Sequence, residues 1–214
     1  SSYPYTTSLT LDGTTTGNVV TGNLTLENPP GSGYLMAMHL TKSGPGDWTV
    51  LGDFIDSGRG CKVTVNDGRL TLAGTNTHSG ATTVNGGLLE VTGSCNSSAA
   101  TVNSGGTIAG GGTVKTLTIQ AGGGFAWSYG DGGDYTMGVN GNLVLNDGWV
   151  LKLADIGDDP DVAAEYDLLT FTGNYNGAAV TGPIALVPGT NFTLNTDNAP
   201  DWNFDSLEVV VDTA

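Results

Sequence analysis

Short apolar stretches in this chain alternate with polar residues, and each stretch follows a glycine. In residues 68–72 (GRLTL) and 141–145 (GNLVL), for example, every second position after the glycine is apolar. This alternation predicts a short β-strand with one buried face. The stretches begin at Gly22, Gly46, Gly68, Gly87, Gly106, Gly124 and Gly141, so their spacing shortens from 24 to 17 residues along the chain.

A second pattern lies just before four of these glycines. It consists of Thr, then Val or Ile, then Asn or Gln, and it occupies residues 64–66, 83–85, 101–103 and 118–120. Two patterns that repeat together indicate a repeat architecture, because one such unit cannot bury its own apolar face and has to stack on its neighbours. Since no helical segment separates the strands, the spacing predicts an all-β parallel solenoid (a β-helix) with one coil per repeat. The alternative is an antiparallel sandwich of short strands.

The solenoid predicts which side chains stack from coil to coil. Equivalent strands of successive coils lie about 4.8 Å apart. Val65, Val84, Val102 and Ile119 are then expected to form one inward apolar ladder, and Leu70, Leu89 and Ile108 a second. The asparagines that end the second pattern, Asn66, Asn85 and Asn103, are expected to form a polar ladder at the turn.

Two segments of the repeat region have a recognisable pattern, residues 72–93 (LAGTNTHSGATTVNGGLLEVTG) and residues 40–50 (LTKSGPGDWTV). They resemble the autotransporter-associated β-strand repeat family, in which residues 40–50 are similar to the usual opening of the unit. The resemblance is clear over about residues 40–115 and weaker towards the end, where YDLLTFTG (166–173) and WNFDSL (202–207) are similar to segments that often come after such repeats. It implies a secreted right-handed β-helix, often the stalk or passenger of a surface protein, with no catalytic residues. His78 departs from the family pattern, which commonly has an aromatic residue there.

The ends of the chain differ from its middle, although we expect one structural domain. Residues 1–38 are interpreted as an N-terminal arm with the first irregular coils, residues 39–153 as the solenoid repeats, and residues 154–214 as a β-rich section that closes the C-terminal end. Atypical terminal units are expected of a solenoid, because an open sheet edge invites aggregation.

The charge excludes several classes of partner. The chain has 6 Lys and Arg against 21 Asp and Glu, which gives a net charge of −15. Such a surface repels phosphate backbones and anionic lipid head groups, so we expect no nucleic-acid binding. No apolar run approaches the ~20 residues that a membrane-spanning helix needs, so we expect no membrane insertion. Together with the resemblance, this composition predicts a secreted or cell-surface protein.

The sequence predicts no enzyme. The two histidines, His39 and His78, show no metal-ligand spacing and no nucleophile motif, so we interpret His78 as a solvent-facing loop residue. Carboxylate pairs occur at Asp53/Asp56 and Asp131/Asp134, but glycoside cleavage needs two carboxylates that face each other across a groove. A polysaccharide-cleaving enzyme is therefore the least favoured alternative.

Acidic side chains crowd two loops and make calcium the one cofactor to consider. Calcium takes six to eight oxygen ligands, and carbonyl groups of Gly-rich loops can complete a carboxylate set. The candidate ligands are Asp155, Asp158, Asp159 and Asp161 in one loop and Asp131 and Asp134 in the other. The alternative is that both loops are simply solvated.

Cysteine and tryptophan residues suggest two further features. Cys61 and Cys95 both flank loops and, in an extracellular protein, are expected to form a disulfide. Two reduced thiols or an intermolecular bridge are the alternatives. Trp127 and Tyr129 lie beside an acidic Gly-rich loop and are expected to be exposed, where they could contact a carbohydrate.

The predicted function is structural: a self-assembling subunit of a cell-surface filament or matrix, whose partners are copies of itself. Head-to-tail contacts propagate into a filament when the rotation between subunits does not close. The uncharged arm at the N-terminus is expected to add a strand to a neighbouring subunit, with Tyr3, Tyr5, Leu9 and Leu11 as its contact residues. The alternative is a surface adhesin or passenger module that binds a glycan.

Overall fold

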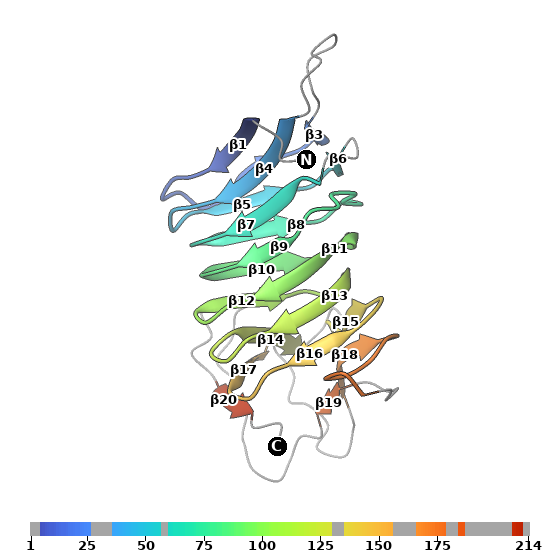
Figure 1. The fold of residues 1–214 in the computed structure, drawn as a ribbon. Coiled ribbons are helices and arrows are strands. Elements are labelled where there is room, and N and C mark those ends of the chain that lie inside the picture. The colour runs from blue at the N-terminus through green and yellow to red at the C-terminus, as the bar shows by residue number, and fades with distance from the viewer. Residues whose placement is uncertain are drawn as a thin grey trace.

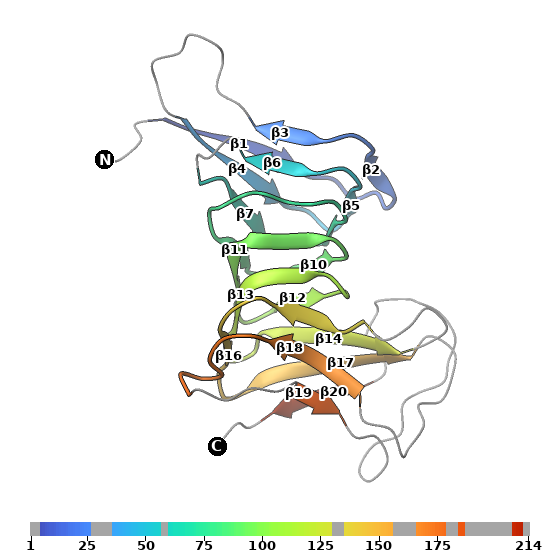
Figure 2. The ribbon, with the colours of Figure 1, turned by 90° about the vertical axis from the view of Figure 1, so that its right-hand side faces the viewer.

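The protein is a stack of parallel β-coils. The computed structural model describes residues 5–26, 36–56, 60–129, 135–155, 166–178, 184–186 and 207–211. Every regular element in these ranges is a β-strand, so they hold no helix that could span a membrane. Figures 1 and 2 show the strands stacked one above another along a single axis, with the N-terminal strands at one end.

The strands form three sheets, and within each sheet a strand pairs with its equivalent in the next coil. Sheet A has the order β1 (Tyr5–Leu11), β4 (Met36–Lys42), β7 (Lys62–Val65), β9 (Thr82–Val84), β11 (Ser94–Val102), β13 (Thr113–Ile119), β15 (Met137–Val139), β18 (Tyr166–Phe171) and β19 (Ile184–Leu186), with β16 (Leu143–Leu145) also paired to β13. Sheet B has the order β2 (Asn18–Val20), β5 (Asp47–Val50), β8 (Arg69–Leu72), β10 (Gly87–Val91), β12 (Gly106–Ala109), β14 (Gly124–Tyr129), β17 (Trp149–Asp155) and β20 (Leu207–Val211). Sheet C pairs β3 (Leu24–Leu26) with β6 (Phe54–Asp56). The parallel solenoid is thereby confirmed, and the antiparallel sandwich is wrong.

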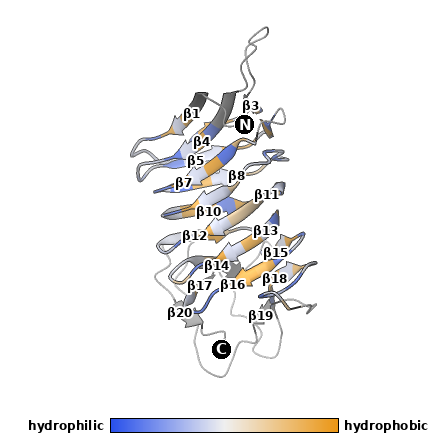
Figure 3. Ribbon diagram, in the orientation of Figure 1, coloured by the Kyte–Doolittle hydropathy of each residue, from blue (hydrophilic) through white to orange (hydrophobic). Residues whose placement is uncertain are grey.

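The two apolar ladders predicted from the sequence fill the core. Val65, Val84, Val102 and Ile119 are all 0% exposed, and Leu145 extends their ladder by one more coil. Leu70, Leu89 and Ile108 are equally buried, and Phe125 and Leu151 continue the second ladder. Figure 3 shows apolar and polar positions mixed along the strands. The members of the two apolar ladders are the buried positions among them.

The asparagine ladder is also present. Asn85 Nδ2 donates to Asn66 Oδ1 (2.9 Å), and Asn103 Nδ2 donates to Asn85 Oδ1 (2.8 Å). Further along the stack, Asn146 Nδ2 donates to Gln120 Oε1 (2.9 Å). Each of these amides thus links its turn to the turn of the adjacent coil.

A file of glycines marks one corner of successive coils. A Cβ on Gly74, Gly93 or Gly112 would collide with the carbonyl oxygen of the glycine in the coil before it, which is Gly52, Gly74 or Gly93 respectively. The backbones are this close because the chain leaves sheet B at the same point in every coil. Glycine is required at this corner for space rather than for an unusual φ angle.

The glycine spacing misplaces the first and last repeats. The spacing aligns residues 22–26 with 46–50, yet Val20 pairs with Val50, and Leu24 pairs with Phe54 in sheet C. At the other end, Leu143 and Leu145 pair with Leu117 and Ile119 in sheet A rather than with β14. Longer loops join the terminal coils, so a constant glycine spacing does not hold there.

The two ends of the stack differ in how their strands are paired. At the N-terminal end, β1, β2 and β3 each form the edge of their sheet. At the other end, β19 pairs with β18 and β20 pairs with β17, and both pairs are antiparallel. The change of direction interrupts the parallel stacking after β17 and β18.

Candidate functional site

The first coil brings three unpaired strand edges together. β1, β2 and β3 pair with β4, β5 and β6 on one side, and no strand among the described residues pairs with their other side. The exposed large apolar side chains of the described residues lie beside β2: Val19 is 48% exposed and Leu51 is 52% exposed. The Leu51 N–H donates to the Val20 carbonyl (2.9 Å), which places Leu51 directly against the edge strand.

The four predicted contact residues of the N-terminal arm differ in whether the structure describes them and in how far they are buried. Tyr3 lies outside the described residues, and Tyr5 is described only as the first position of β1. Leu11 is buried, and Leu9 packs against the core in a half-buried position. These two leucines therefore fill their own coil instead of presenting side chains to a neighbour. The main-chain edge of β1, rather than its leucine side chains, is what a neighbour can reach.

Lys42 is a buried cation that the sequence patterns did not predict. It pairs with Leu11 on one side and with Val65 on the other, so it occupies the inward position of the valine ladder, and it is 0% exposed. Its Nζ donates to the carbonyl oxygens of Ser43 (2.9 Å), Gly44 (2.6 Å) and Asp67 (3.2 Å). Burial lowers the pKa of the Lys42 ammonium, while the carboxylates of Asp67, Asp12 and Asp47 act in the opposite direction. The aligned Thr-Lys and Thr-Val pairs at residues 41–42 and 64–65 were the signal that could have found it.

His78 is buried, so its prediction as a solvent-facing loop residue is wrong. It is 0% exposed, and its ring lies against Phe54 with a centroid distance of 5.2 Å. Its Nε2 and Thr82 Oγ1 are 2.8 Å apart, Thr82 Oγ1 and Ser98 Oγ are 2.8 Å apart, and Ser98 Oγ donates to the Gly80 carbonyl (2.6 Å).

The direction of this chain of hydrogen bonds fixes the proton on His78. A carbonyl oxygen only accepts, so Ser98 uses its hydrogen there and accepts from Thr82, which in turn accepts from Nε2–H of His78. In the neutral ring Nδ1 is therefore the unprotonated nitrogen, and it is buried without a hydrogen-bond partner. Burial lowers the pKa of His78 to about 4, although the Asp56 carboxylate opposes that shift. The network packs one corner of the coils and leaves the imidazole no access to a substrate.

The expected disulfide between Cys61 and Cys95 is not formed. Both cysteines are buried thiols. Cys95 pairs with Val114, whereas Cys61 directly precedes β7 and its carbonyl accepts the Gly80 N–H (3.0 Å). Burial raises the pKa of the Cys95 thiol to about 12, and a hydrogen bond with Asn76 only partly offsets this. Cys95 is therefore an inert core residue.

Of the residues predicted to contact a carbohydrate or calcium, the structure describes the side chain of Trp127 and leaves those of the others outside its described part. Trp127 is 1% exposed and belongs to the core, so its prediction as an exposed sugar contact is wrong. The side chains of Tyr129 and Asp155, and the residues Asp131, Asp134, Asp158, Asp159 and Asp161, lie outside what the structure describes. The register does place Tyr129 opposite Asp155, so the two acidic loops follow neighbouring strands at the same end of β14 and β17.

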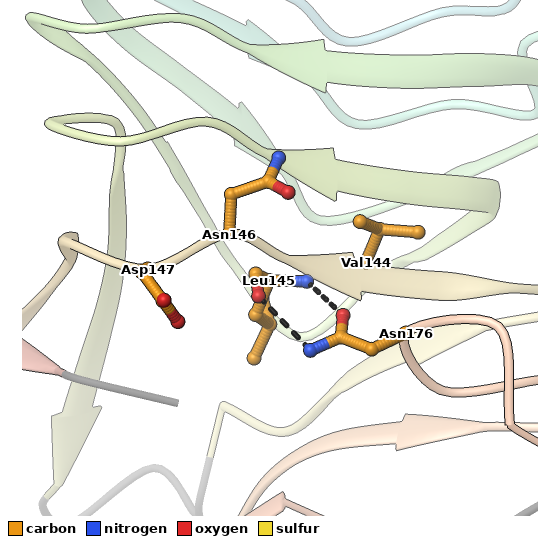
Figure 4. A pocket seen from close by; sticks show the side chains of 5 residues that line it. All are labelled: Val144, Leu145, Asn146, Asp147 and Asn176. Carbon is orange, nitrogen blue, oxygen red and sulfur yellow. Dashed lines mark hydrogen bonds between the residues drawn. The ribbon is translucent and has the colours of Figure 1, made fainter. Parts of the chain in front are cut away.

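An open pocket of about 300 Å³ lies beside β16 and the turn that follows it. Val144, Leu145, Asn146, Asp147 and Asn176 line it (Figure 4). Asn176, at a positive φ of 46°, receives the Leu145 N–H on Oδ1 (2.8 Å) and returns a hydrogen bond from Nδ2 to the Leu145 carbonyl (3.1 Å). Its side chain thus replaces a main-chain partner at the edge of β16. The side-chain amides of Asn146 and Asn176 are used in hydrogen bonds within and between coils, and we assign no ligand to this pocket.

Comparison with known proteins identifies the repeat but no individual relative. A search of curated proteins with this sequence finds no match. The family model described as the passenger-associated-transport-repeat matches residues 65–91, which run from the end of β7 through β8 and β9 to the end of β10. The stretch spans about one and a half coils, since Val65 pairs with Val84 in the next coil, and it contains members of both apolar ladders. Residues 65–91 are thus similar to the passenger-associated-transport-repeat, which confirms the resemblance to autotransporter-associated repeats.

Proposed function

We propose that this protein is a non-enzymatic, extracellular structural solenoid with right-handed coils that assembles head to tail into a surface filament or matrix. The passenger-associated repeat supports a place at the cell surface. The observation that carries the assembly is that the edges of three sheets, β1, β2 and β3, lie in the same terminal coil.

The physical case rests on the main-chain groups on the side of β1, β2 and β3 that no described strand pairs with. An edge strand presents a row of N–H and C=O groups that can template pairing with another chain. Protective features are few at this end: β1 carries no charged side chain, and Val19 and Leu51 leave apolar surface beside β2. A neighbouring subunit that adds strands there would bury both the edge and the apolar side chains.

The opposite end offers a different surface, which makes the contact heterologous. β19 and β20 run antiparallel to the strands with which they pair, whereas β1 and β2 run parallel to theirs. The strands at the two ends of the stack therefore run in opposite directions. A contact between unlike ends repeats indefinitely unless the rotation closes a ring. Pairing between two N-terminal ends would instead give a closed dimer.

Electron microscopy and light scattering of the purified chain test this proposal. We expect regular filaments from the parent protein and monomers from the double variant Val19→Lys, Leu51→Lys, because two buried like charges would oppose the contact. The control is Ala99→Lys, an exposed position in the middle of sheet A, which should assemble normally. Monodisperse monomers of the parent protein, or closed dimers, would overturn the filament.

Calcium is the cofactor that we propose for the two acidic loops. Because Tyr129 lies opposite Asp155, the loops after β14 and β17 both begin at one end of sheet B. Four aspartates fall within the seven residues 155–161 of the sequence, a density of carboxylates that calcium would neutralise. The microscopy is therefore repeated in millimolar calcium and with a chelator. The melting temperature is measured in the same two conditions. Equal values with calcium and with the chelator would count against calcium binding, whether or not filaments form.

A further inference from the structure

The outer face of sheet A carries two parallel files of neutral hydrogen-bonding side chains. The first file consists of outward threonines that pair in register from coil to coil: Thr10, Thr41, Thr64, Thr83, Thr101 and Thr118. The second file lies two residues further along each strand and consists of Asn66, Asn85, Asn103 and Gln120. We call the part spanning β7 to β13 the Thr/Asn face.

The spacing of this face follows from β-geometry. Adjacent coils are about 4.8 Å apart, and two residues along a strand span about 6.6 Å, so the groups form a regular grid. The four threonines on the Thr/Asn face are half-buried, and Asn66 and Asn85 are exposed, so the grid is open to solvent.

The hydrogen bonds between the asparagines leave half of the donors and acceptors of the Asn85 side chain unused. Asn85 gives one N–H to Asn66 and receives one from Asn103. Since an amide has two N–H donors and two acceptor lone pairs, a donor and an acceptor at this position remain for an outside partner. Each threonine hydroxyl likewise can donate one hydrogen bond and accept others. Every coil therefore offers both donors and acceptors, as a hydroxyl-rich partner requires.

The Thr/Asn face contains no carboxylate although the protein is strongly acidic. The outward positions beside the threonines are Lys62, Ala81, Ala99 and Thr116, so no acidic side chain points outward from these four strands in a chain with 21 acidic residues. The outer face of sheet B differs, because Glu90 (6% exposed), Ala109 (0%) and Ala126 (0%) are buried there. Between β7 and β13, the outer face of sheet A is therefore open and its strands carry no acidic side chain, whereas the outer face of sheet B is buried.

We propose that the Thr/Asn face binds a neutral, extended β-linked polysaccharide that lies along the solenoid axis. The partner has to be neutral because the net charge of −15 repels anionic polysaccharides and the face offers no carboxylate to a cationic one. A polymer is favoured over a short sugar because single hydroxyl contacts are weak, whereas contacts repeated at every coil add through effective concentration. This binding is independent of self-assembly, since it uses the side of the solenoid rather than its end.

Depletion of the full chain from solution by microcrystalline cellulose and by chitin particles tests the proposal. We expect binding to at least one of the two, weakened at least about tenfold in the quadruple variant Thr64→Val, Thr83→Val, Thr101→Val, Thr118→Val, because four hydroxyl contacts are lost while shape and strand propensity are kept. The matched control is Thr49→Val, a half-buried threonine on strand β5 of sheet B, which should bind as the parent does.

A second variant tests the same face without removing any hydroxyl. Ala81→Gln, Ala99→Gln places two long neutral side chains at exposed positions beside the threonine file, and it should also weaken binding by about tenfold if the polymer lies there. Circular dichroism confirms that each variant is folded. Binding of the parent to neither particle, or binding that both variants leave unchanged, would overturn the proposal. Failure of the filament proposal would leave this result unaffected, because monomers carry the same face.

Discussion

At Lys42 a single side chain departs from the repeat and changes what holds the coil together. The residues in register with it are Leu11 and Val65, both apolar and buried. Its ammonium bonds three carbonyl groups, of which two belong to the turn after β4 and one to the turn of the next coil. The side chain thereby ties two consecutive turns together at the N-terminal end of the solenoid.

Replacement of Lys42 by methionine should lower the free energy of unfolding by about 3 kcal/mol. The variant keeps the length of the side chain but leaves buried carbonyl oxygens without their donor, which is the costly part of such a change. Urea denaturation measures it, with Lys62→Met, an exposed lysine of the next coil, as a control expected to stay within about 0.5 kcal/mol. A Lys42→Met protein as stable as its parent would mean that the desolvation of the ammonium cancels its three hydrogen bonds.

His78 makes stability depend on pH in a defined window. Its pKa is about 4 in the folded chain and 6.5 when unfolded, so the unfolded state binds more protons between these values. The free energy of unfolding should therefore fall as the pH is lowered from 6.5 to 4, by about 3 kcal/mol in total from this group, and be unaffected by it above pH 7.

The variant His78→Gln isolates this effect, because glutamine can still donate to Thr82 but does not titrate. Denaturation at a series of pH values should give a shallower slope for the variant between pH 4 and 6.5. The variant His39→Gln provides the comparison with a second histidine. The pKa of His39 is also lowered, by burial and by the charge of Lys62. Equal slopes for His78→Gln and the parent would show that the imidazole is not held neutral in the fold.

Among the elements, the glycine corner decides how closely coils can stack. Gly111 and Gly112 are neighbours in the turn between β12 and β13, yet only Gly112 faces the coil before it. An added Cβ at Gly112 would overlap the Gly93 carbonyl, whereas at Gly111 the nearest atoms are 3.6 Å away in Tyr135.

Gly112→Ala should therefore destabilise the protein by at least about 3 kcal/mol, and Gly111→Ala should change its stability by less than about 0.5 kcal/mol. The two melting temperatures measure the difference with nearly identical chemistry. If both substitutions were tolerated alike, the coils at this corner would have to be further apart than the structure places them.

Strand lengths were harder to predict than strand positions in the middle of the chain. The repeat located β7 to β14 well, since their cores are set by local alternation around a glycine. It missed β15, and it located β16 within residues 141–145 but placed that strand in the wrong sheet. Both strands pair with β13, because two short strands separated by a turn replace one long strand there. Pairing across a 26-residue step, as from Phe125 to Leu151, has no local signal in the sequence.

The parallel stack, taken from end to end, has one terminus that is chemically different from the other. The N-terminal coil keeps three parallel edges, and the last parallel strands of sheets A and B carry antiparallel partners. This asymmetry is the basis of the proposed assembly. The open outer side of sheet A and the buried outer side of sheet B add a second asymmetry, around the axis instead of along it.

The parallel solenoid, the two apolar ladders and the asparagine ladder could be predicted from the amino-acid sequence, because each depends on a short periodic pattern that repeats within about one coil. Which polar residues are buried was decided only when the coils packed together. Lys42, His78 and Cys95 have the local sequence of ordinary loop or surface residues, but their environment is made by coils before and after them in the chain. Trp127 is different, because it lies two residues after the inward Phe125, and the alternation of its own strand therefore already indicates an inward position. The burial of Lys42, His78 and Cys95 depends on contacts between residues distant in sequence, and a local pattern contains no record of them.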